Sequence, residues 1–148
     1  MTTPSQAAHT PTPLAATRAQ HGTLKSSVEL GGRVMLALMF LASGLSKISG
    51  YAATAGYMAA MGVPGGLLPL VIATEVLGAV AIMLGWQTRV VAFLLAGFTA
   101  LAALLFHSNL ADQIQMIMFM KNVSISGAFL LLTVNGAGRY SLDARRGR

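Results

Sequence analysis

The chain has 148 residues, of which 55% are hydrophobic and only 9% carry a charge. A soluble domain devotes about 25% of its residues to charged side chains, because it must cover itself with solvated groups. The composition therefore excludes a soluble globular domain and predicts a small integral membrane protein that forms a single unit. The absence of cysteine excludes a structural disulfide, a thiolate metal site and a dithiol relay on this chain.

The formal net charge of +6 does not indicate a nucleic-acid-binding protein. The basic residues lie at the ends of apolar stretches and in the terminal tail, where topology signals and contacts with lipid headgroups account for them. The expected partner is therefore the lipid bilayer, and we expect no binding to nucleic acid.

Four long apolar stretches predict the architecture. Residues 1–27 come first; they are rich in Thr, Ala, Pro and Gln and contain no apolar run, which predicts a disordered N-terminal tail. The apolar stretches cover residues 30–48, 67–86, 90–107 and 114–134, each close to the ~20 residues that span a bilayer. They are continuous rather than alternating, which favours helices over a membrane barrel. The predicted fold is an all-α, four-helix transmembrane bundle over residues 28–138, with a basic C-terminal tail over residues 139–148.

The connections between these stretches differ in length. GWQTR and SNLADQ are short and predict antiparallel hairpins. The connection after the first span is longer, and its Tyr51, Tyr57, Met58 and Met61 predict a short amphipathic helix at the membrane interface.

The distribution of Lys and Arg predicts the orientation. Four spans place Lys47 alone on one side and eight basic residues on the other: Arg18, Lys25, Arg33, Arg89, Arg139, Arg145, Arg146 and Arg148. Because the basic side faces the cytoplasm in most membrane proteins, both termini are expected to be cytoplasmic.

With this topology, the ionisable groups of four separate spans fall in the outer half of the bundle. Lys47 and His107 lie at outer helix ends, while Glu75 and Lys121 lie roughly 12 Å and roughly 10 Å deep at 1.5 Å per residue. Ionisable groups inside a membrane are costly and commonly mark functional sites. The sequence therefore predicts a ligand-binding polar cluster of Lys47, Glu75, His107, Lys121 and Asn122.

Each of these residues also has a purely structural interpretation. Glu75 and Lys121 lie at nearly the same depth and are predicted to form an ion pair, which could do no more than fix helix register. Lys47 could extend to the interface, and His107 could be a helix-end residue. Asn122 could be an ordinary interhelical hydrogen-bonding residue. No metal ligand set is recognisable, and no catalytic residue can be assigned.

Several segments in order resemble the DoxX family of small bacterial membrane proteins. They are ALMFLASGLSKI, EVLGAVAIMLGWQTRVVA, FMKNVSISGAFLLL and GAGRYSLD, and together they cover about residues 30–143. The resemblance implies a four-helix protein of the bacterial inner membrane. Some members are subunits of thiosulfate:quinone oxidoreductase, and others associate with oxidative-stress or sulfur-redox enzymes. The family-like positions are Arg89 together with the five residues of the predicted cluster.

We therefore expect an accessory subunit in quinone-linked or sulfur and oxidative-stress redox processes, rather than a self-sufficient enzyme. The chain has no intrinsic cofactor motif, so the candidate cofactor is a bound quinone, and the candidate partners are a redox subunit or further copies of the chain. The alternative is a non-catalytic membrane scaffold or assembly protein. A small-solute carrier formed by dimerisation is a third hypothesis.

Overall fold

The computed structural model describes residues 13–146, and they form an all-α fold without strands. The long helices are α1 (Pro13–Ser49), α3 (Leu68–Leu84), α4 (Thr88–Phe106) and α5 (Gln113–Asn135). Shorter elements are α2 (Tyr51–Ala60), the 3₁₀ turn η1 (Gly65–Leu67) and α6 (Leu142–Arg146). Within the described chain, four segments are long and apolar enough to span a bilayer: Gly22–Ser49, Gly65–Leu84, Thr88–Phe106 and Gln113–Asn135. The predicted all-α membrane bundle is confirmed, including the short helix after the first span.

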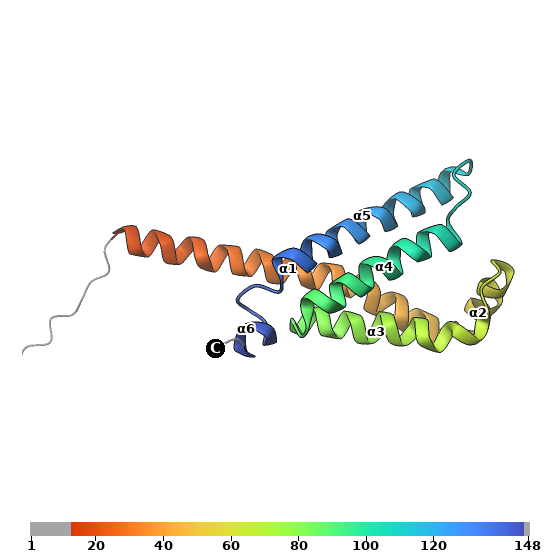
Figure 1. The fold of residues 1–148 in the computed structure, drawn as a ribbon, viewed down its shortest axis with the longest axis horizontal. Helices are drawn as coiled ribbons and strands as arrows, with labels where there is room; N and C mark the ends of the chain where they lie inside the picture. The colour runs from red at the N-terminus through yellow and green to blue at the C-terminus, as the bar shows by residue number, and fades with distance from the viewer. Residues whose placement is uncertain (1–12, 147–148) are drawn as a thin grey trace, which may run out of the picture.

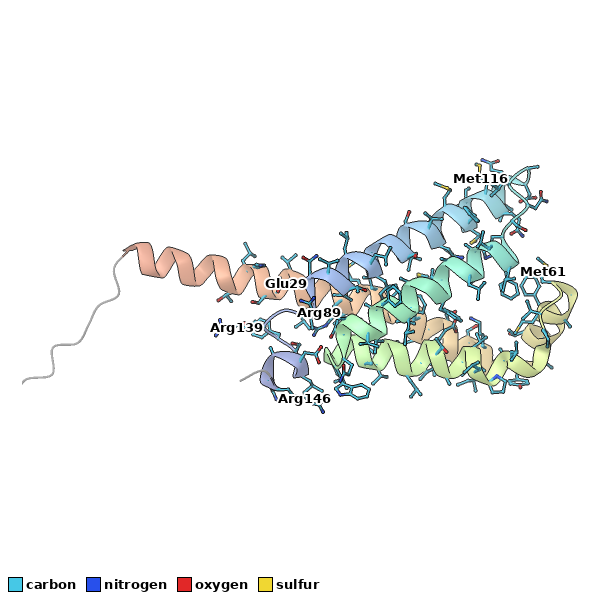
Figure 2. All side chains as sticks on the ribbon, in the orientation of Figure 1. Glu29, Met61, Arg89, Met116, Arg139 and Arg146 are labelled. Carbon is cyan, nitrogen blue, oxygen red and sulfur yellow. The ribbon has the colours of Figure 1, made fainter. Side chains whose placement is uncertain are left out.

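The four long helices pack mainly as two pairs, α1 with α3 and α4 with α5. Figure 1 shows the pairs together near α6 and diverging toward α2. We call these two regions the α6 end and the α2 end; the predicted outer half of the bundle is the half nearer the α2 end. Figure 2 shows Arg89, Arg139 and Arg146 near the α6 end, and Met61 and Met116 at the opposite end.

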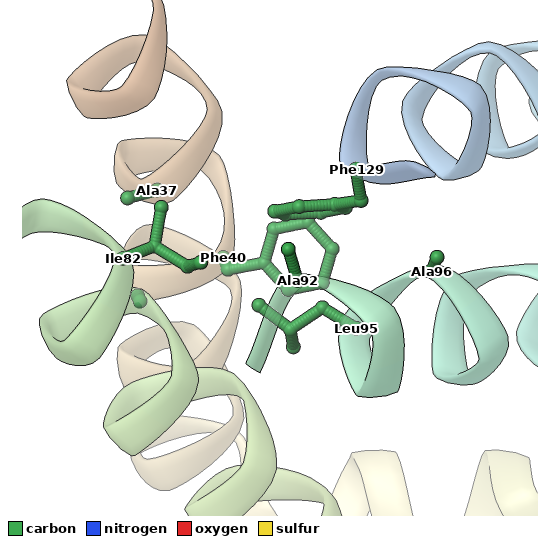
Figure 3. Packing of buried hydrophobic residues seen from close by; sticks show 8 residues of the cluster. Ala37, Phe40, Ile82, Ala92, Leu95, Ala96 and Phe129 are labelled. Carbon is green, nitrogen blue, oxygen red and sulfur yellow. The ribbon is translucent and has the colours of Figure 1, made fainter. Parts of the chain in front are cut away.

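A compact hydrophobic core joins the two helix pairs. Phe40 of α1 meets Phe129 of α5 edge to face, with ring centroids 5.2 Å apart. Ile82 of α3 and Leu95 of α4 pack into the same buried cluster (Figure 3). Small residues complete it and let the helices approach closely, as is usual in membrane bundles: Ala37, Ala79, Ala92 and Ala96.

Gly44 sets the close approach of α1 to α3. A Cβ atom at this position would lie 2.7 Å from Val76 Cγ2 and 3.2 Å from Glu75 Cβ. A larger residue would force the Val76 side chain or α3 itself to shift, because 2.7 Å is well inside van der Waals contact. Gly44 therefore holds α1 against the face of α3 that carries Glu75.

The two predicted tails differ from the structure. The chain is helical from Pro13, so the expected disorder is corrected for residues 13–27; residues 1–12 lie outside the described part. This stretch adds turns to an existing helix, which needs no new nucleus, and its Ala, Leu, Gln and Arg residues favour helix. At the other end, α6 is a helix whose Asp143 bonds back to α4, so the basic tail is in part a structural element.

Candidate functional site

A cavity of about 470 Å³ lies between the two helix pairs toward the α2 end. Its wall is mainly apolar, with Val71, Phe98 and Leu105 among the lining residues. All five residues of the predicted polar cluster also line it: Lys47, Glu75, His107, Lys121 and Asn122. The fold thus brings together side chains from α1, α3 and α5 and from the end of α4; ligand binding by this cluster stays a prediction.

Glu75 is paired with Lys47. Lys47 Nζ lies 2.9 Å from both carboxylate oxygens of Glu75. Ser43 completes the arrangement, because its hydroxyl accepts from Lys47 Nζ at 2.6 Å and donates to Glu75 Oε1 at 3.2 Å. Glu75 is buried, and this hydrogen-bonded pairing offsets the penalty of placing its charge in the bundle.

This geometry corrects two predictions. Glu75 pairs with Lys47 and not with Lys121, and Lys47 does not extend outward to the interface. Helical side chains tilt toward the N-terminus of their helix, so Lys47 reaches back along α1 to the level of Ser43. The close approach at Gly44 puts Glu75 within its reach.

Lys121 has a different environment. Its side chain is exposed along α5, and its Nζ donates to Met118 Sδ at 3.2 Å, which is a weak acceptor. Among residues 13–146, no carboxylate lies within ion-pair distance of Lys121. The lysine therefore brings a positive charge to the cavity that no acidic side chain of the described chain neutralises.

The remaining polar residues are held by neighbouring helices. His107 is the C-cap of α4, and its Nδ1 lies 2.8 Å from Gln115 Oε1 of α5. Ser126 of α5 donates to the Ala96 carbonyl at 2.9 Å, which fixes α5 against α4 one turn beyond Asn122. These contacts orient α5 so that Lys121 and Asn122 both line the cavity.

Helix α2 covers the cavity at the α2 end. Tyr57 stacks on Phe106 of α4, with ring centroids 5.7 Å apart and planes inclined by 25°. Met58 is buried, and all three residues line the cavity. The short helix predicted from the tyrosines and methionines thus forms part of the cavity wall.

The α6 end carries a second polar arrangement, centred on Arg33, which is only 2% exposed. Its Nη1 donates to the carbonyl of Ala137, and its Nη2 donates to those of Met83 at 3.1 Å and Tyr140 at 2.7 Å. One guanidinium thereby ties α1 to the end of α3 and to the segment after α5. The sequence reasoning counted Arg33 only as a topology signal and missed this role.

Asp143 of α6 caps α4 from a distance of 55 residues in the sequence. Its Oδ1 accepts from the Gln87 amide and its Oδ2 from the Thr88 amide, both at 2.8 Å. Burial raises the pKa of Asp143, but the hydrogen bonds from Thr88 and Gln87 and the charge of Arg146 outweigh it and hold this pKa below its ordinary value. Gly85 in GWQTR and Gly138 in GAGRYSLD adopt positive φ angles of 66° and 73°, which glycine tolerates best. These glycines were the sequence signal for tight turns in the two segments that meet at this cap.

These features define a class of protein: a small helical membrane protein with four spans, closed at one end and hollowed at the other. Residues 28–108, more than half of the chain, match the DoxX family. The chain belongs to the DoxX family.

Two relatives from Escherichia coli strain K12 are similar to this chain over most of its length. Inner membrane protein YqjF is 53% identical over 114 residues, which cover 77% of this chain and 88% of that protein. Inner membrane protein YphA is 39% identical over 131 residues, which cover 84% and 94%. No solved structure matches the chain significantly. The names of both relatives and the four apolar helices agree with an inner-membrane location.

Proposed function

We propose that the protein is an accessory inner-membrane subunit in quinone-linked or sulfur and oxidative-stress redox processes, and that it binds a quinone headgroup or a small anion in the cavity. The observation that carries the proposal is the convergence of Lys47, Glu75, His107, Lys121 and Asn122 on one mainly apolar cavity. A site with apolar walls and a few convergent polar groups is typical of small-molecule binding.

The cavity residues would have different roles, some in binding the ligand and one in proton transfer. Lys121 and the Asn122 amide are donors that suit the carbonyl oxygens of a quinone or the oxygens of an anion. Reduction of a quinone takes up two protons with two electrons, and the imidazole of His107, which lines the cavity, is a group that can relay protons. The electrons would come from a partner subunit, which gives this chain the role of binding and positioning.

Photo-crosslinking with an azido-quinone analogue tests the proposal. We expect labelled peptides from the cavity-lining parts of α1, α3, α4 or α5, and we expect excess unmodified quinone or thiosulfate to suppress the labelling. Labelling confined to the α6 end, or labelling that neither competitor reduces, would contradict it.

A non-catalytic scaffold is the second candidate. It is favoured by the Lys47–Glu75–Ser43 arrangement, whose charges satisfy each other without a ligand. Native mass spectrometry of protein purified in mild detergent separates the two functions. A co-purifying quinone or redox subunit supports the first, and protein that is consistently free of both supports the scaffold.

We also propose that both termini face the cytoplasm. The support is the basic residues that the fold places around the α6 end, among them Arg89, Arg139 and Arg146 (Figure 2). Alkaline phosphatase fused after residue 148 is expected to be inactive, and the same reporter inserted at Gly62 is expected to be active. The reverse pattern would refute this orientation.

A further inference from the structure

The cavity has an unbalanced charge. Glu75 is the acidic residue among its described lining residues, and Lys47 neutralises it through contacts of 2.9 Å to both oxygens. Asp112, the N-cap of α5, accepts from the Gln115 amide at 2.9 Å and does not line the cavity. Lys121 is therefore left as a surplus positive charge.

The cavity also reaches the lipid-facing surface of the bundle. Leu70 of α3 and Leu101 of α4 line it, yet they are 65% and 54% exposed. They belong to different helix pairs, which diverge toward this end (Figure 1). In a membrane, exposed apolar side chains within spans face hydrocarbon, so the apolar wall of the cavity is continuous with the lipid-facing surface at Leu70 and Leu101.

A positive group beside apolar walls that open to lipid suits a ligand with two chemically different parts. A small hydrophilic anion would satisfy Lys121 but would leave the apolar wall facing water. A neutral apolar chain would cover the wall but would leave Lys121 bound only to the sulfur of Met118. Both requirements are met by a molecule that carries one acidic headgroup and one hydrocarbon chain.

We propose that the ligand of this cavity is a single-chain anionic amphiphile, with its acidic headgroup on Lys121 and its chain against Phe98, Leu101 and Leu70. This inference rests on the proposed function only in using the same cavity. It replaces the quinone headgroup or small anion of that function by an acid that carries a hydrocarbon chain and is drawn from the bilayer.

Binding of matched fluorescent probes tests the proposal. The full chain is placed in phosphatidylcholine nanodiscs, and saturable binding of pyrene-dodecanoate is compared with that of pyrene-dodecanol, which has the same chain without the charge. We expect the acid to bind about tenfold more tightly, as one charge-assisted hydrogen bond implies. In Lys121→Met the preference should fall to about one, and Lys121→Arg should retain it.

Lys25→Met is the matched control, because Lys25 is an exposed lysine of α1 that pairs with Glu29 and does not line the cavity. This variant should keep the full preference for the acid. Thermal unfolding of Lys121→Met checks that its fold is intact; if this variant does not fold, Lys121→Gln takes its place in the same comparison.

Three outcomes would overturn the inference. The first is an acid preference that survives in a folded variant without the Lys121 charge. The second is equal binding of acid and alcohol with displacement of both by a quinone analogue, which would leave the proposed function standing. The third is displacement of pyrene-dodecanoate by thiosulfate as effectively as by unlabelled dodecanoate, which would assign the cavity to a small anion. Absence of saturable binding by either probe would likewise overturn the inference, and if the quinone crosslink also fails, the proposed function falls with it.

Discussion

The α6 end and the α2 end of this molecule use charged residues in opposite ways. At the α6 end, Arg33 donates to three backbone carbonyls and Asp143 accepts from two backbone amides, so each charge holds separate segments together. At the α2 end, Lys47 and Glu75 satisfy each other, and Lys121 is left beside a cavity. A small bundle can keep a charged cavity at one end because its other end is closed by hydrogen bonds and the Phe40–Phe129 core. The comparison predicts which substitutions unfold the protein and which leave the fold intact.

Removing the guanidinium of Arg33 should have the largest effect. In Arg33→Met the carbonyls of Met83, Ala137 and Tyr140 lose a donor in a buried site, and we expect a loss of about 4 kcal/mol in the free energy of unfolding. Unfolding in mild detergent, followed by circular dichroism, measures it. Lys25→Met, which removes an exposed positive charge from the same helix, should be close to wild type. Similar stabilities for the two variants would show that the hydrogen bonds of Arg33 at the α6 end do not stabilise the fold.

The Lys47–Glu75 pair should come next. Lys47→Met leaves the buried charge of Glu75 unpaired, for which we expect a loss of about 3 kcal/mol; Glu75→Gln leaves the half-buried Lys47 unpaired and should cost less. The double variant Glu75→Gln with Lys47→Met should recover a large part of this loss. Glu75→Gln with Lys121→Met should show no such recovery, because Lys121 does not contact Glu75. The same unfolding experiment measures both double variants. Recovery of stability in Glu75→Gln with Lys121→Met would show that Glu75 pairs with Lys121, as predicted from the sequence.

Gly85→Ala tests the turn between α3 and α4. Its φ of 66° is unfavourable for alanine, and a Cβ would lie 3.0 Å from Ser141 Cα, so we expect a loss of about 2 kcal/mol. Gly97→Ala is the control, since a Cβ there would meet nothing within 4 Å and alanine favours the helix interior. Chemical denaturation should rank Gly97→Ala at or above wild type. Equal stabilities for the two alanine variants would mean that the α6 end adapts to a displaced loop.

Asp143 should give the smallest effect, visible as a dependence on pH. Its pKa in the folded protein is lowered from 3.8, so its stabilising contribution is fully present above about 3.8 and is lost as the pH falls from there through the folded value. Asp143→Asn should remove this part of the acid-induced loss of stability. Unfolding midpoints at pH 7 and at pH 3 measure it: the difference between them should be smaller in the variant. An unchanged difference would show that other carboxylates govern acid unfolding.

The sequence predicted the axial positions of residues better than their directions around each helix. Counting residues placed Lys47, Glu75, His107 and Lys121 in the same half of the bundle, and all four line one cavity. Depth alone does not say which helices are neighbours, however, so Glu75 was assigned to Lys121. The deciding feature was Gly44, whose missing side chain brings α1 to α3. Such a contact is visible in the sequence only as one more small residue.

The α6 end was missed for a different reason. Arg33 and Asp143 form hydrogen bonds with backbone atoms. Every residue has such atoms, so the sequence does not indicate which residue is the partner. The composition of residues 13–27 predicted disorder, but this stretch is helical because it extends the helix that follows it. Hydrophobic periodicity and length therefore predicted the spans, while the long-range capping contacts required the folded chain.

The cap formed by Asp143 has a consequence for how the protein is made. Arg33 enters the membrane with the first span, but its acceptors at Ala137 and Tyr140 leave the ribosome more than 100 residues later. Throughout most of synthesis the arginine has only the Met83 carbonyl among its final partners, and the start of α4 lacks its cap. We expect the bundle to close only when the last residues are released, so a chain that ends at Asn135 should insert all four spans and still be degraded rapidly. Residues 137–143 therefore supply the last hydrogen-bond partners of Arg33 and of the start of α4, and a chain truncated before them cannot complete the α6 end.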